Sequence, residues 1–246
     1  MMSSAPLYLW ALEIIGLVAI VLVTARTLRS SAIEVGIDRV VAQRISIVFT
    51  AGWMVWTATV VVLAAGNVLR LDHGTVKPWL GVAIVAPIVV LLASSRLPLI
   101  RRALSHPGIV VTLVRPQEAR FIGIVFLTAL ALGELPAVFA LPAGIGDMAI
   151  GLAASWLIRS PHAGGRTRNI FLLNVFGLID FLYAFAVGFL GGPGRTQLLH
   201  LTPSTQSVSM LPLVLIPTTG VPVLFVFHVI SLTKLRVKVP VEAVPV

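Results

Sequence analysis

The sequence predicts an all-α fold, a polytopic transmembrane helix bundle with seven spans, and three observations carry this prediction. Apolar residues make up 58% of the 246 residues and charged residues 11%, whereas soluble domains are roughly half apolar and a quarter charged. The apolar residues form long continuous runs, unlike the alternating segments of about ten residues that are typical of transmembrane barrels. The basic residues gather in alternate connections between these runs.

A helix needs roughly twenty apolar residues to cross the hydrocarbon core of a bilayer. The expected spans, all within one transmembrane domain covering 1–246, are 7–27, 45–68, 78–94, 121–139, 147–158, 170–190 and 210–232. The fifth span is short, and only residues 140–146 separate it from the fourth. The first ten residues lack a basic region and a cleavage site, so we read the first run as a retained helix and not as a signal peptide.

The distribution of basic residues predicts the orientation. Fifteen of the 18 Lys and Arg residues fall in the odd-numbered connections and the C-terminal tail, and three fall on the other side. Because cytoplasmic connections carry an excess of Lys and Arg, we expect an external N-terminus and a cytoplasmic C-terminus in the inner membrane. The formal charge of +9 then reflects orientation and does not indicate nucleic-acid binding. The longest connection, 96–120, is basic and contains three prolines, and we expect it to lie along the headgroups.

Acidic residues within the apolar runs are the first candidates for function. Glu13 lies about two turns into the first span, and Asp180 lies near the middle of the sixth. A charged carboxylate at such depth is costly unless it is paired, hydrated or neutralised. Asn174 and Gly177 share a helix face with Asp180, so we expect this face to point into the bundle. These residues form either a cation or proton site, or hydrogen bonds that hold neighbouring helices together.

Proline and glycine interrupt two further segments. Glu134 and the segment Leu141–Asp147 are expected to form an irregular turn in which Asp147 caps the next helix. The last span contains Pro217 and Pro222, so we expect a break or kink there, with the hydroxyls of Thr218 and Thr219 beside freed carbonyl groups. Either segment serves as an ion site or as ordinary capping and kinking. The candidate residues for a substrate or ion site are Glu13, Glu134, Asp147, Asn174, Asp180, Thr218 and Thr219.

The sequence excludes several kinds of site. There is no cysteine, so disulfides and thiolate chemistry are absent. His228 is the one histidine clearly within a span, which argues against a bis-histidine haem, and no lysine lies in mid-span to bind retinal. The run Gly144–Ala149 has the glycine spacing of a dinucleotide-binding motif. That motif works only where a strand precedes the helix, and no strand is expected here. We therefore predict no cofactor and no recognised catalytic motif.

The segments Leu141–Asp147 and Leu211–Pro217 resemble stretches of an uncharacterised family of small seven-helix bacterial inner-membrane proteins. The resemblance covers the second half of the chain and implies a bacterial setting, without an activity.

Three functions stay open, and the leading one is a small-molecule or ion transporter or binding protein with a polar site near mid-membrane. The first rival is a membrane-embedded enzyme with an external site formed by Glu134, Asp147 and either His73 or His200. The second rival is a non-catalytic subunit or assembly factor whose polar residues bind partner helices. The expected partners are the lipid bilayer, a small cation or small molecule, and either a second copy of the chain or another membrane protein.

Overall fold

The computed structural model describes residues 5–72, 78–160 and 165–238, and within these ranges the chain is helical and contains no strand. The α-helices are α1 (Leu7–Glu34), α2 (Arg39–Ala65), α3 (Trp79–Ser94), α4 (Pro98–Ala103), α5 (Ile109–Thr112), α6 (Ile124–Ala131), α7 (Ala137–Arg159), α8 (Arg166–Leu190) and α9 (Val221–Lys238). Two 3-10 helices, η1 (Arg115–Gly123) and η2 (Thr205–Ser209), and one π turn, η3 (Ile216–Gly220), complete the described elements.

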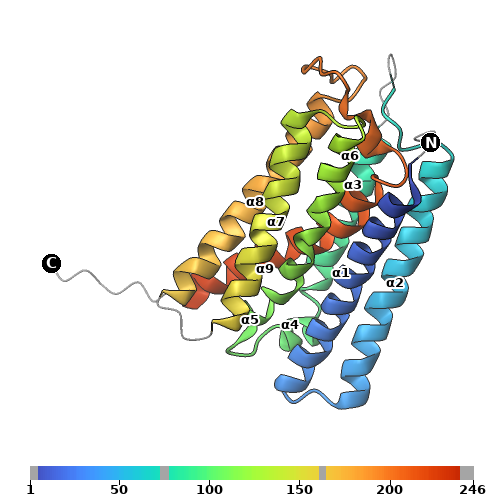
Figure 1. The fold of residues 1–246 in the computed structure, drawn as a ribbon. Coiled ribbons are helices and arrows are strands. Elements are labelled where there is room, and N and C mark those ends of the chain that lie inside the picture. The colour runs from blue at the N-terminus through green and yellow to red at the C-terminus, as the bar shows by residue number, and fades with distance from the viewer. Residues whose placement is uncertain (1–4, 73–77, 161–164, 239–246) are drawn as a thin grey trace.

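The long helices form a bundle around α9. In Figure 1, α9 passes through the middle, with α7 and α8 on one side and α1 and α2 on the other. The most apolar part of the last helix is 72% buried inside the bundle, compared with 17% for α2. The first helix begins and the last helix ends at opposite ends of the bundle (Figure 1).

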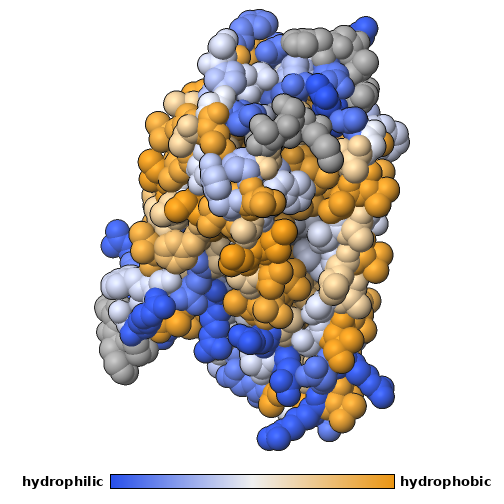
Figure 2. All heavy atoms as spheres, turned by 45° about the vertical axis from the view of Figure 1, so that its right-hand side comes forward, coloured by the Kyte–Doolittle hydropathy of each residue, from blue (hydrophilic) through white to orange (hydrophobic). Residues whose placement is uncertain are grey.

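The described residues contain five helices that are long and apolar enough to cross a membrane, and α3 is a shorter apolar helix. Figure 2 shows a hydrophobic band over the middle of one face, with hydrophilic residues toward both ends. Val48, Val55 and Val62 of α2 are each about 70% exposed. Such a continuous apolar surface is unfavourable in water and favourable in lipid, which indicates a membrane protein.

The boundary between the expected fourth and fifth spans is wrong. The helical segment formed by η1 and α6 ends at Ala131, and the turn follows at residues 132–136 instead of 140–146. The nine residues of η1 and the eight of α6 rise about 2.0 and 1.5 Å per residue respectively, so together they extend about 30 Å. The stretched 3-10 geometry therefore gives a 17-residue segment the thickness of the hydrocarbon core.

The segment Leu141–Asp147 is helical, contrary to expectation. The helix α7 continues through Pro142, and Asp147 lies in its interior instead of capping it. Proline cannot donate to the carbonyl four residues earlier, which here belongs to Val138. The hydroxyl of Tyr183 on α8 donates to the Val138 carbonyl oxygen at 2.8 Å, so a neighbouring helix satisfies the group that Pro142 leaves free.

The last span is irregular at the expected place, but the chain stays helical there. Residues Ile216–Gly220 form a π turn that leads directly into α9. Pro222 leaves the carbonyl of Thr218 without its helical donor, and the indole nitrogen of Trp56 on α2 donates to that oxygen at 2.9 Å. The deep position of Trp56 in the second span is thereby explained.

The connection 96–120 is largely helical, and part of its apolar surface is buried. Its short helices α4 and α5 fold against one end of the bundle, where Leu104, Ile109 and Leu113 are buried. From Arg115 the chain enters the bundle as η1. These three apolar residues are thus part of the core, whereas Leu97 and Leu99 are exposed.

Glycines let η1 and α7 approach closely. A Cβ atom on Gly123 would lie 2.5 Å from the Cβ of Asp147 and 2.7 Å from the carbonyl oxygen of Gly144. No real Cβ tolerates such distances, and the second atom belongs to the backbone, which cannot rotate away. This contact brings the backbone of Asp147 next to η1.

We expect Gly123→Ala to destabilise the protein by about 1–3 kcal/mol, because the added methyl group overpacks a rigid contact. Thermal unfolding in detergent, followed by size-exclusion chromatography, measures this effect. Gly52→Ala on α2 is the matched control, since a Cβ there has nothing within 4 Å. Equal unfolding temperatures for the two variants would contradict the close η1–α7 contact.

Candidate functional site

The guanidinium group of Arg120 lies at the centre of the bundle, fully buried. Its Nε donates to Asp147 Oδ1 on α7 at 2.6 Å, and its Nη2 donates to Asp180 Oδ2 on α8. Its Nη1 donates to the carbonyl oxygen of Gly177 at 3.3 Å and contacts His228 Nε2 on α9 at 3.1 Å. One side chain from η1 thus joins three long helices.

The network continues beyond His228. Arginine carries only donors, so His228 Nε2 must accept, and the ring proton then resides on Nδ1. This Nδ1 lies 2.8 Å from Asn174 Oδ1. The amide nitrogen of Asn174 donates to the Ile170 carbonyl and to Ser231 Oγ, at 2.7 and 2.9 Å. All these contacts agree with one direction of hydrogen bonding, in which the His228 ring is neutral.

Glycines also make room for this network. A Cβ on Gly177 would collide with the His228 ring and would lie 2.9 Å from Arg120 Nη1. A Cβ on Gly146 would collide with the Asp180 carboxylate. The absence of side chains at these two positions lets α7, α8 and α9 come close enough for their polar groups to meet.

The charges in the network do not balance. Asp147 and Asp180 carry two negative charges when ionised, Arg120 carries one positive charge, and the Asp147 and Asp180 side chains are only 6% and 13% exposed. A net charge of −1 is strongly disfavoured within a low-dielectric bundle. The arrangement therefore suits one additional positive charge, held as a proton on a carboxylate or as a cation beside it.

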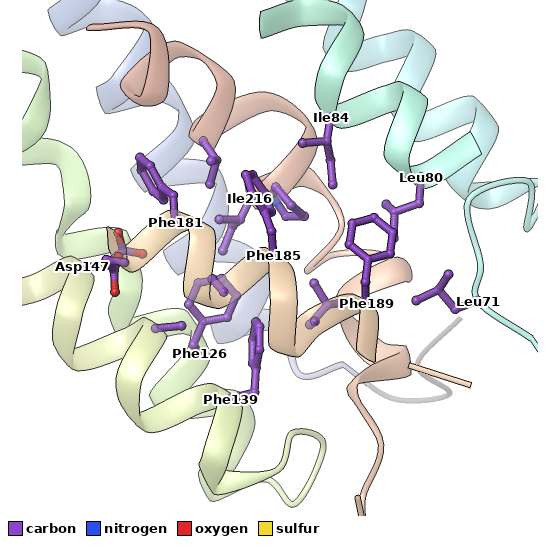
Figure 3. Close-up of a pocket in the computed structure, with 17 residues that line it drawn as sticks. Leu71, Leu80, Ile84, Phe126, Phe139, Asp147, Phe181, Phe185, Phe189 and Ile216 are labelled. Atoms are coloured by element: carbon purple, nitrogen blue, oxygen red, sulfur yellow. The ribbon is translucent and has the colours of Figure 1, made fainter. Parts of the chain in front are cut away.

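An apolar cavity opens next to the two carboxylates. It is narrow, with about 40 Å³ open to the centre of a water-sized sphere, and both Asp147 and Asp180 line it. Its other lining is apolar, and five of these residues are aromatic: Phe126, Phe139, Phe181, Phe185 and Phe189. In Figure 3, Asp147 stands at one end of this cavity and Leu71 at the other.

Phe181 separates the buried guanidinium from the cavity. Its ring centroid lies 3.9 Å from Arg120 Cζ, a cation–π contact. The ring also meets His228 edge-on at a centroid distance of 5.9 Å. The carboxylate of Asp180, which is the more exposed of the two, is thus the more accessible charged group.

The structure brings together three of the candidate residues named from the sequence. Asp147, Asn174 and Asp180 belong to one network, and Asn174 joins it through His228. Thr218 and Thr219 have another role: their hydroxyls donate to the carbonyls of Val214 and Leu215, both at 2.6 Å. They satisfy backbone groups at the π turn.

Glu13 and Glu134 lie apart from this network. Glu134 is half-buried in the turn between α6 and α7, and its carboxylate accepts a hydrogen bond from Ser207 at 3.2 Å. Glu13 is fully buried on α1.

The external site of the rival enzyme is not assembled in the described residues. Asp147 lies ten residues into α7, about 15 Å along the helix from the turn that holds Glu134. His200 is exposed, and His73 falls outside the described residues. In the described part of the chain no three His, Asp or Glu side chains are placed to hold a metal ion together.

Arg120, His228 and Ser231 are the network residues that sequence reasoning missed. Arg120 precedes an apolar run and was counted with the cytoplasmic loop cations, although it is buried. The available signal was the pair of intramembrane aspartates, because two buried carboxylates require a counter-charge. His228 was considered only as a haem ligand.

Residues 77–236 match a protein family described as "Domain of unknown function (DUF8737)". The match covers more than half of the chain. The chain belongs to the DUF8737 family. Every residue of the Arg120 network lies within the matched residues. No curated protein and no solved structure matches the chain.

In this DUF8737 protein, Arg120→Met should be strongly destabilising, by about 3–5 kcal/mol, because it leaves buried carboxylates without a counter-charge. In the Arg120→Met background, Asp147→Asn should cost much less than it does alone, with a coupling energy of about 1–3 kcal/mol. Thermal unfolding of the four proteins of this double-mutant cycle measures the coupling.

A matched cycle uses Arg159→Met and Glu118→Gln, a pair 3.6 Å apart whose side chains are 71% and 32% exposed. Its coupling should be about 0–1 kcal/mol. Equal coupling in both cycles would contradict the central role of Arg120.

Proposed function

We propose that the protein is a transporter that exchanges a proton for a small organic cation with an apolar body. The observation that carries this proposal is the shared guanidinium: Asp147 and Asp180 bind one Arg120 and also line the aromatic cavity. A site with two carboxylates and one buried cation accepts one further positive charge. A proton and a cationic ligand therefore compete for the same place.

The exchange keeps the charge of the bundle constant. With the cavity free of ligand, one carboxylate of the Asp147–Asp180 pair holds a proton. When a cationic group enters beside Asp180, the proton leaves for solvent, so one positive charge replaces another. Neither state leaves a net charge inside the bundle, which is the condition that the low dielectric imposes.

The lining of the cavity favours an apolar body on the ligand. Phenylalanine faces attract cations, and they also exclude water, so a hydrated inorganic ion would lose its shell without compensation. A cation with its charge spread over an apolar frame loses little hydration. Lipophilic organic cations are the ligand class that fits both the aromatic rings and the carboxylates.

We expect an outward-directed proton gradient to drive the uptake of tetraphenylphosphonium into liposomes that contain the purified protein. Asp180→Asn should abolish the uptake, since the amide has nearly the shape of the carboxyl but cannot exchange its charge. The matched control is Asp38→Asn, because Asp38 caps α2 through the backbone N–H groups of Val40 and Val41, and Asn caps a helix equally well.

A second control uses the probe itself. Tetraphenylborate has the size and shape of tetraphenylphosphonium with the opposite charge, and it should neither bind nor compete. Uptake by Asp180→Asn at the wild-type rate, or equal handling of the two probes, would overturn the proposal.

We further propose seven spans, with the N-terminus outside and the C-terminus in the cytoplasm of a bacterial inner membrane. The five long apolar helices, the shorter α3 and the stretched η1–α6 segment supply seven crossings. The excess of basic residues in alternate connections supports the orientation.

The cysteine-free chain makes this topology testable with single cysteines. Ser105 and Leu198 are both exposed and lie in different connections. In intact cells, Leu198→Cys should react with a membrane-impermeant maleimide and Ser105→Cys should not, whereas permeabilised cells should label both. Reaction of both in intact cells would contradict an odd number of crossings between them.

A further inference from the structure

Glu13 is a second buried carboxyl group, and the proton and cation exchange described above does not use it. It lies on α1 with no exposed surface. Neither of its side-chain oxygens makes a hydrogen bond of normal geometry within the described residues. A charged carboxylate so placed is disfavoured, whereas a protonated one is tolerated.

The carboxyl group of Glu13 faces the π turn of the last span. It is close enough to the backbone N–H of Ile216, the first residue of that turn, for this group to favour its charged form. This N–H makes a long bond of 3.3 Å to the Leu213 carbonyl, so it is poorly held. Pro217 follows and has no N–H of its own. The Ile216 N–H is therefore a donor that a negative charge on Glu13 can attract.

The same π turn borders the aromatic cavity on its other side. Ile216 and Pro217 line the cavity, and α1 packs against the end of the turn, where a Cβ on Gly220 would lie 3.2 Å from Leu17 and Ile20. Trp56 holds the Thr218 carbonyl. A change at Glu13 thus reaches the cavity through five residues of irregular helix, a structure that occurs frequently at functional sites.

Glu13 is also distinct from the Arg120 network. Ile216 and His228 are twelve residues apart along the last span, about 18 Å at helical rise. The π turn and α6 pack against α1 and carry no charged side chain. The charged residues of α2 are Arg39 and Arg44, which lie in the first turns of that helix. On η1, Ile122 meets α1 one turn from Glu13, where a Cβ on Gly16 would touch its side chain. The charged residues of η1 are Arg115, Glu118 and Arg120.

We propose that Glu13 is a separate proton-binding site that controls the conformation of the π turn. When Glu13 is protonated, the Ile216 N–H stays with the Leu213 carbonyl. When the proton leaves to solvent, the carboxylate draws this N–H toward itself, and Ile216 and Pro217 move at the wall of the cavity. The site binds a proton whether or not the cavity carries an organic cation.

Infrared difference spectroscopy between low and high pH tests the proton site directly in reconstituted protein. We expect the carbonyl band of a protonated carboxylic acid, lost in Glu13→Gln and retained in Asp180→Asn and in the control Glu118→Gln. If Glu13→Gln fails to fold, wild-type protein with ¹³C-labelled glutamate must shift the band, and Glu134→Gln in the turn between α6 and α7 must retain it. A band that shifts only with labelled aspartate would overturn the proposal.

Trp56 reports the coupling to the π turn, since its indole binds the Thr218 carbonyl. We expect a pH-dependent change of tryptophan fluorescence that disappears in both Trp56→Phe and Glu13→Gln. Persistence of a Trp56-dependent change in Glu13→Gln would overturn the coupling. Both measurements are independent of cation uptake, so a failure of the proposed transport leaves them interpretable.

Discussion

The ion pairs of Arg120 with Asp147 and Asp180 are the contacts around which this bundle is arranged. A guanidinium group with no exposed surface has to be surrounded by acceptors, and these come from α7, α8 and, through His228, from α9. Breaking any of them would leave a charge unpaired in a medium that solvates charges poorly. The close packing of η1 against α7 and of α8 against α9 follows from the need to bring these groups within hydrogen-bonding distance.

The same need explains the glycines and prolines of the second half of the chain. Gly123, Gly146 and Gly177 lie where a side chain would displace Asp147, Asp180 or His228. The prolines remove helical hydrogen bonds, and each carbonyl that Pro142 and Pro222 leave free receives a donor from a neighbouring helix, Tyr183 or Trp56. In a bilayer no water is present to replace these donors, so the prolines also fix which helices are neighbours.

Two kinds of acidic site emerge from this arrangement. The Asp147–Asp180 pair shares a cation and borders an aromatic cavity, which suits the binding of an exchangeable positive charge. Glu13 stands alone against a π turn, which suits a single proton. Because Ile216 and Pro217 line the cavity and Glu13 lies against the same π turn, the two sites have a physical path along which to communicate.

The sequence by itself determined the all-helical class, the apolar runs and the list of buried acids, because hydropathy, charge distribution and the cost of intramembrane carboxylates are local properties of the chain. The inward face of Asn174, Gly177 and Asp180 followed from helical periodicity alone. Tertiary structure decided the rest. The helix through Pro142 depends on a hydroxyl from Tyr183, 41 residues away, and Arg120 pairs with acids 27 and 60 residues away. Such partners lie outside any local window of sequence. The sequence alone therefore could not distinguish Arg120 as a buried counter-charge from a basic residue in a loop.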